Sequence, residues 1–316
     1  MVRLGVQILI FIDPRDPCNR RDVDPRREPS YYCFLKLRPS LLRKGTMMAT
    51  RMSSSMAARN NRGKNRFCHV IPLVLLALSI VTPGAWGQES IPDQVKVVTE
   101  LEKRGAQVFR DETQPDRPVI SVDLDEREFD DAGLSSLKGL TRLQSLSLDG
   151  TRITDAGLAN LKGLTSLIDL SLDNTEIGDA GLAQLEGLKN LQKLSIDRTR
   201  VSDAGLAHLK GMKRLESLSL VSTAVTDAGL THLSGLTRLQ WLLLHNTHIG
   251  DAGIEHLKGL TDLEFLFLHN TQVSDAGLEY LKGLKRLQIL NVENSRVTEA
   301  GVQQLQKLRP QLKISF

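Results

Sequence analysis

From residue 119 to the end of the chain, leucines recur in two alternating patterns. The string L-x-x-L-x-L-x-x-T-x-[IV] is followed by D-A-G-L-x-x-L-x-G-L, as in residues 143–164. The alternation of Leu146 and Leu148 is typical of a strand with one buried face. Leu158 and Leu161 lie three residues apart, which places them on one face of a short helical segment. Each period therefore predicts one strand and one short helix.

Residues at the ends of each helical segment support this prediction. Thr154 is a candidate N-cap, and Asp155 places a carboxylate in the first turn of the helix. Gly163 is a candidate helix stop. Residues 119–309 contain no proline, so no strand of the expected parallel sheet loses a hydrogen-bond donor.

The triplet Asp-Ala-Gly marks the length of the period. Its glycine, or that of the variant Glu-Ala-Gly, recurs every 24 residues without insertion, at Gly133, Gly157, Gly181, Gly205, Gly229, Gly253, Gly277 and Gly301. The strand and helix of one period cannot bury their apolar sides alone, whereas stacked units bury both. We therefore expect eight periods in register, with side chains 24 positions apart as lateral neighbours.

This pattern resembles the leucine-rich repeat family, whose repeats contain about 20 to 29 residues with a strand and a helical segment. The resemblance covers residues 119–316 and implies an α/β solenoid, a horseshoe with a parallel concave sheet and short convex helices. Helices about 10 Å wide and strands about 4.8 Å apart require such a stack to curve with the sheet inside. The repeats look like those of bacterial secreted or envelope proteins.

The repeat departs from the common pattern at its ninth position. Most leucine-rich repeats carry Asn or Cys there, whereas this chain has Thr151, Thr175, Thr199, Thr223, Thr247, Thr271 and Ser295. We expect the hydroxyl to satisfy the buried backbone of the loop, with fewer donors than an amide. The D-x-G-L run is also similar to the repeats of F-box substrate receptors, but those carry Cys at this position and an F-box ahead of the repeats, which we do not find in this sequence.

The front of the chain has a different composition. Residues 1–46 mix Arg, Pro and short apolar runs, so we expect them to be disordered or a mis-called start ahead of the methionines from Met47 onward. Basic residues then precede an apolar run at 70–82 and a small-x-small cleavage site that ends at Gly87, which predicts a signal peptide over 47–87. The run is shorter than the about 20 apolar residues of a membrane span. We expect export to the periplasm, the cell envelope or the medium, and contact with a membrane only if the leader is not cleaved.

Residues 88–118 are predicted to form an N-terminal cap. They contain a candidate amphipathic helix with Val95, Val98 and Leu101 on one face, followed by a short strand. The repeat domain at 119–316 should then contain nine strands and eight helical segments.

Charge is unevenly distributed along the chain. Residues 1–87 carry 15 basic and 5 acidic side chains, and the remainder carries 26 and 32. Without its leader the chain is acidic, which argues against nucleic acid as a partner. Every cysteine lies within residues 1–87, at Cys18, Cys33 and Cys68. The rest of the chain can therefore form no disulfide and no Cys-ligated metal site. The sequence indicates no cofactor.

The strand positions that differ between repeats point to a binding surface. In a chain with 4% aromatic residues, three aromatic side chains fall on the exposed side of neighbouring strands. Contiguous apolar patches on an exposed face are rare outside contact sites. We therefore expect a partner-binding surface formed by Trp241, Leu243, His245, Phe265, Phe267, His269 and Ile289. Self-association and coverage by a terminal segment are the alternatives.

A column of aspartates is the second feature of that face. Asp125, Asp149, Asp173 and Asp197 recur at the ends of successive strands. Carboxylates about 4.8 Å apart repel by about 1 kcal/mol even in water. A basic partner, a Ca²⁺ ion or hydrogen bonds within each aspartate's own turn would offset this repulsion, and we favour the turn.

The histidines give weaker signals. His208, His232 and His256 recur on the helical segments, where neighbouring helices are about 8–10 Å apart, too far for shared metal ligation. We expect them to form a solvated face. His245 and His269 are close enough to share a metal, but the sequence shows no clear third ligand, and we predict no metal site.

No catalytic motif of a nucleophile with a base, no phosphate-binding loop and no metalloprotease signature occurs in the sequence. We therefore expect a non-enzymatic, exported module that binds a protein partner through its concave sheet. A module that binds cell-wall or extracellular polysaccharide, or a structural component of the envelope, are the alternatives.

Overall fold

The computed structural model describes residues 91–316. The expectations for residues 1–46 and for the signal peptide at 47–87 fall outside this part of the chain and stay predictions. No helix within the described part is long and apolar enough to cross a bilayer.

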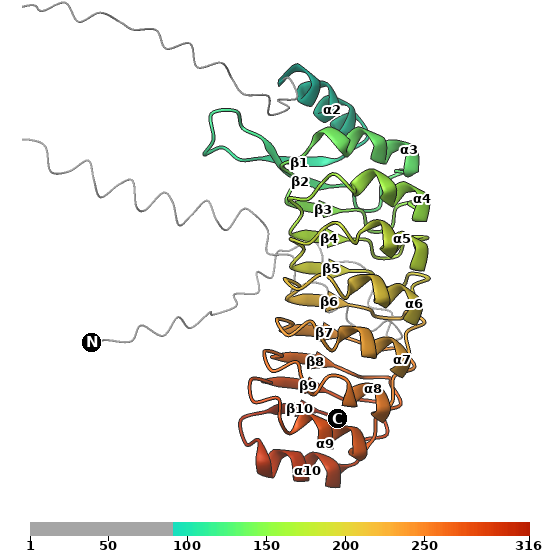
Figure 1. The fold of residues 1–316 in the computed structure, drawn as a ribbon, viewed down its shortest axis with the longest axis vertical. Coiled ribbons are helices and arrows are strands. Elements are labelled where there is room, and N and C mark those ends of the chain that lie inside the picture. The colour runs from blue at the N-terminus through green and yellow to red at the C-terminus, as the bar shows by residue number, and fades with distance from the viewer. Residues whose placement is uncertain (1–90) are drawn as a thin grey trace, which may run out of the picture. The chain divides into compact units, whose positions relative to one another are not determined.

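One ten-stranded sheet runs through the described residues (Figure 1). Its strands follow chain order: β1 (Gln107–Arg110), β2 (Val119–Asp123), β3 (Ser145–Ser147), β4 (Asp169–Ser171), β5 (Lys193–Ser195), β6 (Ser217–Ser219), β7 (Trp241–Leu243), β8 (Phe265–Phe267), β9 (Ile289–Asn291) and β10 (Lys313–Ser315). Strands β2 to β10 are parallel, and β1 pairs antiparallel with β2. This is the predicted set of nine strands with one short strand before them.

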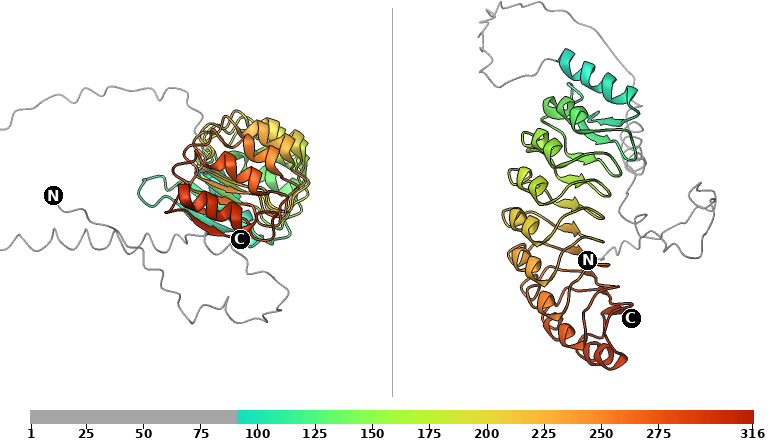
Figure 2. Two further views of the ribbon diagram at one scale, coloured as in Figure 1. Left: turned by 90° about the horizontal axis from the view of Figure 1, so that it is seen from below. Right: turned by 90° about the vertical axis from the view of Figure 1, so that its right-hand side faces the viewer.

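Short helices alternate with the strands, on the outer side of the curved stack (Figure 2). They are α2 (Ile91–Lys103), α3 (Asp131–Leu134), α4 (Asp155–Leu158), α5 (Asp179–Gln184), α6 (Asp203–Leu206), α7 (Asp227–Leu230), α8 (Asp251–Glu255), α9 (Asp275–Leu281) and α10 (Glu299–Leu308). Four of them continue as 3₁₀ helices, η4 (Ser135–Gly139), η5 (Ala159–Leu161), η6 (Ala207–Leu209) and η7 (Thr231–Leu233). The three-residue leucine spacing matches the about three residues per turn of 3₁₀ geometry.

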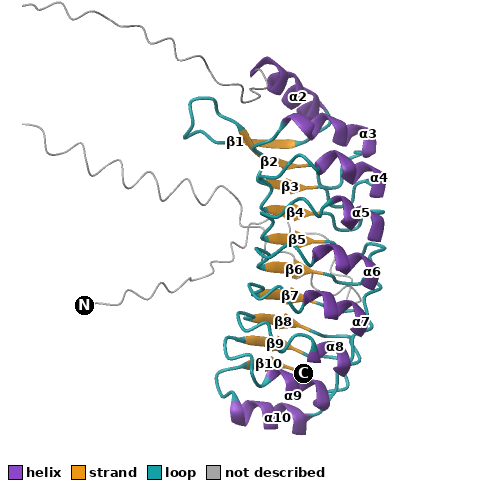
Figure 3. Cartoon of the chain, viewed as in Figure 1, coloured by secondary structure: helices purple, strands orange, loops and turns teal. Residues whose placement is uncertain are grey.

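The predicted register is confirmed along the parallel sheet. Leu146 is paired with Leu170, and Leu218 with Leu242, each 24 positions apart. The same offset holds from β2 to β10, and Figure 3 shows these strands side by side in chain order. Equivalent side chains of successive repeats are therefore lateral neighbours, which confirms the α/β solenoid with its sheet on the inner side.

The leucines of successive repeats form one continuous core. Strand leucines such as Leu170 and helix leucines such as Leu182 are fully buried. Each buried leucine contributes about 2 kcal/mol through the hydrophobic effect, before the entropy cost of ordering the chain. Each repeat forms one coil of the solenoid, and packing between neighbouring coils holds the solenoid together.

Helix α2 contacts the first coil through part of its predicted apolar face. Val98 and Leu101 are buried, whereas Val95 is 51% exposed. A step of three residues turns an α-helix by about 300°, so Val95 lies about 120° away from Leu101 around the axis. That rotation takes Val95 out of the contact, and the three-residue face predicted from the sequence was wrong at this residue.

The hydroxyl column at the ninth repeat position does what the sequence predicted. The hydroxyl of Thr151 donates a hydrogen bond to the carbonyl of Leu148 at 2.6 Å. Buried hydroxyls at the equivalent positions repeat this bond, at Thr175, Thr199, Thr223, Thr247 and Thr271. The helical segment ends at Leu161, just before Gly163. Gly163 does not end it through a left-handed backbone, because the described glycines with positive φ are Gly105 and Gly150.

The aspartate of each Asp-Ala-Gly triplet joins its repeat to the next. Asp179 accepts hydrogen bonds from the backbone N–H of Ser202 at 2.8 Å and from its hydroxyl at 2.6 Å. Asp155 accepts one from the backbone N–H of Gly178 at 2.6 Å. The contact recurs at Asp131, Asp203, Asp227, Asp251 and Asp275. The sequence predicted a helix-terminal role for these residues but not the bond between coils.

Candidate binding surface on the concave sheet

Alternation along the strands decides which side chains line the inner face. In β7, Leu242 is fully buried, whereas Trp241 and Leu243 on either side of it are partly exposed. Strand β8 repeats the pattern with Phe265 and Phe267. We call the five apolar side chains of this region the aromatic cluster: Trp241, Leu243, Phe265, Phe267 and Ile289. The structure places all five on the inner face of three adjacent strands.

Cross-strand pairing brings the cluster together. Trp241 is paired with Phe265, and Phe265 with Ile289. The rings of Trp241 and Phe265 are stacked, with centroids 3.6 Å apart and planes at 13°. One face of each ring is therefore covered by the other ring.

His245 and His269, which we call the histidine pair, lie two residues beyond β7 and β8. Their rings are stacked, with centroids 3.9 Å apart and planes at 19°. His269 is only 6% exposed, whereas His245 is partly exposed. The sequence placed both at the edge of the predicted surface, but burial leaves His245 as the member that a partner can reach.

The environment of His245 disfavours a positive charge. Burial, with smaller contributions from His269 and the guanidinium of Arg198, lowers the pKa of His245 to about 3. The buried Nδ1 atom of His245 has no hydrogen-bond partner within the described residues. His245 is therefore neutral at neutral pH. In residues 91–316, no group of three or more His, Cys, Asp or Glu side chains is arranged to hold a metal ion.

The aspartate column forms hydrogen bonds to the following coil. Asp149 accepts one from the hydroxyl of Ser171 at 2.5 Å and one from the backbone N–H of Asp173 at 2.9 Å. We call the whole series the aspartate–serine ladder: Asp125, Asp149, Asp173 and Asp197 as acceptors, with Ser147, Ser171, Ser195 and Ser219 as hydroxyl donors.

The preference for bonds within each aspartate's own turn was therefore wrong. The N–H groups of that turn are already used, because Gly150 donates to the carbonyl of Asp173 and Thr151 to the carbonyl of Leu148. The in-register neighbour supplies the nearest free donors about 4.8 Å away.

The carboxylates of the ladder affect each other. The pKa of Asp149 is raised to about 6, mainly by burial and also by the neighbouring carboxylates of Asp173 and Asp125. Hydrogen bonds from Ser171 and from the backbone of Asp173 oppose it. Burial, together with the like charges of the column, thus raises the pKa of Asp149 by more than the hydrogen bonds lower it.

The inner face has two chemically different halves. The ladder ends at Val221, which donates its backbone N–H to Asp197 at 2.7 Å but carries no carboxylate. His245 occupies the equivalent position of the next repeat, and the aromatic cluster begins in the same strand. Strands β2 to β6 therefore present serine and aspartate together with Lys193, and β7 to β9 present apolar side chains apart from Asn291.

The convex histidines lie where the sequence predicted, on the outer helices. His208, His232 and His256 are partly exposed, and the Nδ1 atom of His208 lies 2.6 Å from a carboxylate oxygen of Glu186.

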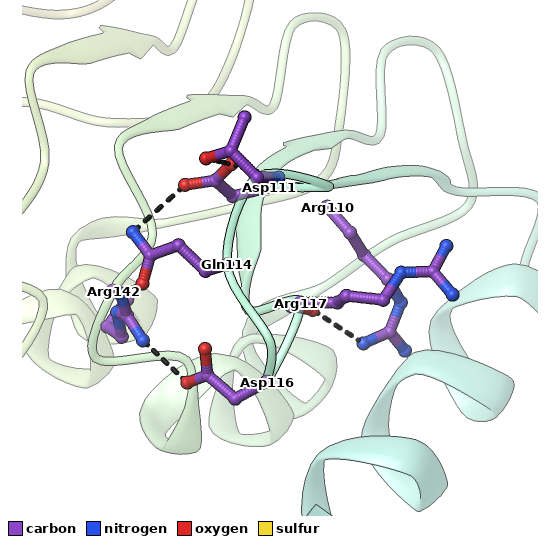
Figure 4. Close-up of polar contacts among 7 residues, drawn as sticks. Arg110, Asp111, Gln114, Asp116, Arg117 and Arg142 are labelled. Atoms are coloured by element: carbon purple, nitrogen blue, oxygen red, sulfur yellow. Dashed lines mark hydrogen bonds and ion pairs between the residues drawn. The ribbon is translucent and has the colours of Figure 1, made fainter. Parts of the chain in front are cut away.

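The connection between β1 and β2, residues 111–118, was not identified in the sequence. Arg142 of the following repeat holds it, through an ion pair with Asp116 at 2.6 Å and a hydrogen bond to the side-chain oxygen of Gln114 (Figure 4). Gln114 also donates to Asp111 at 3.0 Å. The charged residues of the connection were the available signal, but their partner lies in a later repeat.

A comparison with models of protein families agrees with the repeat pattern. Residues 141–201 match a family model described as leucine rich repeat. Internalin C2 of Listeria monocytogenes is similar over 59% of this chain and 77% of its own, with 24% identity and a TM-score of 0.49. The ectodomain of the plant receptor kinase GASSHO1/SCHENGEN3 from Arabidopsis thaliana, in complex with CASPARIAN STRIP INTEGRITY FACTOR 2, is similar over 66% of this chain and 25% of its own, with 21% identity and a TM-score of 0.48. No curated protein sequence matches the chain.

Proposed function

The chain is a leucine-rich repeat protein, and from this premise we propose that it is a non-enzymatic, exported module that binds a protein partner through the inner face of its sheet. Stacked repeats create the extended concave surfaces that such proteins use for binding. The observation that carries the proposal is the partly exposed aromatic cluster on three adjacent strands.

The cluster has the properties of an interface centre. A large aromatic side chain can bury about 150–250 Å², and tryptophan is enriched among the residues that dominate binding energy. The Trp241–Phe265 stack is already formed in the free chain. Binding therefore loses little side-chain entropy there, because the rings need no further ordering.

A polysaccharide partner is the second candidate, and the Trp241–Phe265 stack leaves it fewer open ring faces. Stacking on a sugar needs an open aromatic face. Trp241 and Phe265 each have one face covered by the other ring. An apolar side chain of a protein can instead pack against ring edges and against Leu243. An envelope structural component is the third candidate.

The chemistry of the inner face supports a non-enzymatic role. The hydroxyls of Ser171, Ser195 and Ser219 donate to carboxylates of the ladder and so are engaged as structural donors. A serine nucleophile needs a neighbouring base to accept its proton, commonly a histidine. The ladder carboxylates are held instead by donors of the next coil.

Export is the part of the proposal that the leader supports. Cleavage after Gly87 would leave Gln88 as the first residue of the mature protein. N-terminal sequencing of the protein from culture medium and envelope fractions tests this. A mature N-terminus before Met47 or an intact leader would contradict it.

Proximity labelling in the producing cells, followed by measurement of affinity for each purified candidate, tests partner binding. We expect Trp241→Ala with Phe267→Ala to weaken the true complex at least about 100-fold, which corresponds to about 3 kcal/mol. Leu308→Ala with Phe109→Ala is the matched control, because these exposed apolar side chains lie outside the cluster. Equal loss in both variants, or binding to polysaccharide beads that needs the cluster, would overturn the proposal.

A further inference from the structure

The two long edges of the solenoid carry opposite charge. The basic edge comprises the helix ends and the connections to the next strand, residues 135–144 and every equivalent segment through 279–288. It carries twelve Lys or Arg against six Asp or Glu. The acidic edge comprises the connections from strand to helix, residues 125–134 and every equivalent segment through 269–278. It carries four Lys or Arg against fifteen Asp or Glu. Because the strands are parallel, these connections lie at opposite ends of the strands.

The basic edge contains free cations at a regular spacing. Lys138, Lys162 and Lys210 occupy the same repeat position and are exposed. None of the three forms an ion pair with another described residue. Arg214 of the same edge is exposed and donates to the neutral Asn190 at 2.8 Å. These charges are therefore available to a neighbouring molecule.

The acidic edge also has charges beyond those that the fold uses. The aspartates of the Asp-Ala-Gly triplets and of the ladder bind the next coil. Glu126, Glu128 and Glu176 lie outside both series and are exposed, and Glu176 forms a solvent-exposed ion pair with Arg200 at 3.3 Å. Their carboxylates face the solvent along the edge.

We propose that the basic edge of one copy of this chain binds the acidic edge of a second copy. Lys162 and Lys210 are 48 residues apart, as are Glu128 and Glu176, so two solenoids side by side on the same coil spacing bring more than one cation against more than one carboxylate at once. No other partner is guaranteed to have this spacing. A contact between two identical edges would oppose like charges, which excludes a two-fold dimer through either edge. The association is therefore heterologous and open-ended.

The association is electrostatic and leaves the inner face free. A single exposed ion pair contributes about 0–1 kcal/mol, so only a row of them holds two copies together. Charges at the surface are screened beyond about 10 Å at an ionic strength of about 0.1 M. Side-by-side solenoids keep their concave faces open to the partner proposed above.

Sedimentation velocity of the full chain across protein concentration tests the proposal. In about 20 mM salt we expect the weight-average mass to rise at least about twofold, and to return to the monomer value in about 500 mM salt. The triple variant Lys138→Glu, Lys162→Glu and Lys210→Glu should remain monomeric at low salt. The triple variant Glu126→Lys, Glu128→Lys and Glu176→Lys should also remain monomeric.

An equimolar mixture of the two triple variants is the decisive measurement. The first variant keeps an intact acidic edge and the second keeps an intact basic edge, so the mixture should regain association between unlike variants. The matched control Lys96→Glu, Lys103→Glu and Lys307→Glu changes net charge equally at exposed sites outside both edges and should associate like the wild type.

Several results would overturn the proposal. A wild-type chain that stays monomeric at low salt, or a mixture that stays monomeric, would do so. Association abolished by Trp241→Ala would assign self-contact to the aromatic cluster instead. A monomer that binds heparin through Lys138, Lys162 and Lys210 would assign the basic edge to a polyanion.

Discussion

The Oδ1 atom of Asp251 lies 2.6 Å from the point where a Cβ atom on Gly277 would stand. The same oxygen accepts the backbone N–H of Ser274 at 2.7 Å. Gly277 is therefore needed for this close approach of the preceding coil, and its backbone is not left-handed. The contact explains why aspartate and glycine recur together in the triplet.

We predict that Gly277→Ala lowers the free energy of unfolding by about 2 kcal/mol, in the range of overpacked cores. The added methyl group displaces the Asp251 carboxylate and weakens its hydrogen bonds to Ser274. Equilibrium urea denaturation measures the loss. Gly283→Ala is the matched control, because nothing lies within 4 Å of the point where its new methyl group would stand. It should change stability by less than about 0.5 kcal/mol, and equal losses in the two variants would contradict the explanation.

The leucine pattern was enough to predict the coil and its register. Burial of Leu146 and Leu170 on one side of neighbouring strands depends only on alternation and a constant period, and both are visible in the sequence. The bond from Asp251 to Ser274 was not predictable in the same way. It connects two coils, and its existence depends on the direction in which each side chain leaves its turn.

A second prediction concerns a left-handed column in the turns after the strands. Seven non-glycine residues and one glycine of this column have positive φ: Glu126, Gly150, Asn174, Arg198, Ser222, Asn246, Asn270 and Asn294. A left-handed backbone costs a residue with a Cβ about 1 kcal/mol. Ser222→Gly, at φ 56°, should therefore raise the thermal midpoint and add about 0.5–1 kcal/mol to the free energy of unfolding.

The control variant for this prediction should change the free energy of unfolding in the opposite direction. Ser234 has a right-handed backbone with φ of −55°. Ser234→Gly should lower the free energy of unfolding by at least about 0.5–1 kcal/mol, because glycine gains unfolded-state freedom there and the hydrogen bond from the Ser234 hydroxyl to the carbonyl of Thr231 is lost. If both glycine variants shift the midpoint downward, backbone strain at Ser222 is not released and the prediction is wrong.

The candidate site was predictable in position but not in detail. Alternation placed Trp241 and Phe265 side by side on one face, and the structure has them there. Whether they bind a partner stays a prediction. The burial of His269 and the donors to Asp149 depend on side-chain rotamers and on which backbone groups are already bonded. A periodic sequence does not contain this information.

A third prediction follows from the raised pKa of Asp149. Its folded-state value is about 6 against an ordinary 3.8, so between these values the folded chain holds a proton that the unfolded chain has released. The contribution of Asp149 to stability is therefore lost as pH rises from about 4 to about 6. Asp149→Asn keeps an oxygen acceptor without the charge. We expect it to be more stable than the wild type by about 2 kcal/mol at about pH 7, and by much less at about pH 4.

Urea denaturation at several pH values measures this difference. Ser171→Ala provides a second arm, because its hydroxyl lowers the pKa of Asp149. Removing that hydroxyl should raise the pKa of Asp149 above 6 and extend the pH range over which stability falls. If the free energy of unfolding of the wild type and of Asp149→Asn changes in parallel with pH, the Asp149 carboxylate does not cause the loss of stability between about pH 4 and about pH 6.

A fourth prediction concerns His245, which acts in the opposite direction. Its pKa is about 3 in the folded chain against an ordinary 6.5, so the unfolded chain takes up a proton first as pH falls. Its contribution is complete above about pH 6.5 and is lost as pH falls toward about 3. For a partly exposed group, screening by solvent limits this to about 2 kcal/mol. The contributions of Asp149 and His245 to the change of the free energy of unfolding with pH thus have opposite signs and offset one another in the wild type.

Substituting Asp149 and His245 one at a time should separate their two contributions to the pH dependence of stability. Between about pH 4 and about pH 6, we expect the stability of Asp149→Asn to rise with pH and that of His245→Phe to fall with pH, because each variant retains the other titrating group. The double variant should be flatter than either single variant. The ring-proton resonances of His245 should keep their neutral positions down to about pH 4. A His245 resonance that titrates near pH 6.5 would contradict two statements: that the pH dependences contributed by Asp149 and His245 offset one another, and that His245 beside the aromatic cluster is neutral.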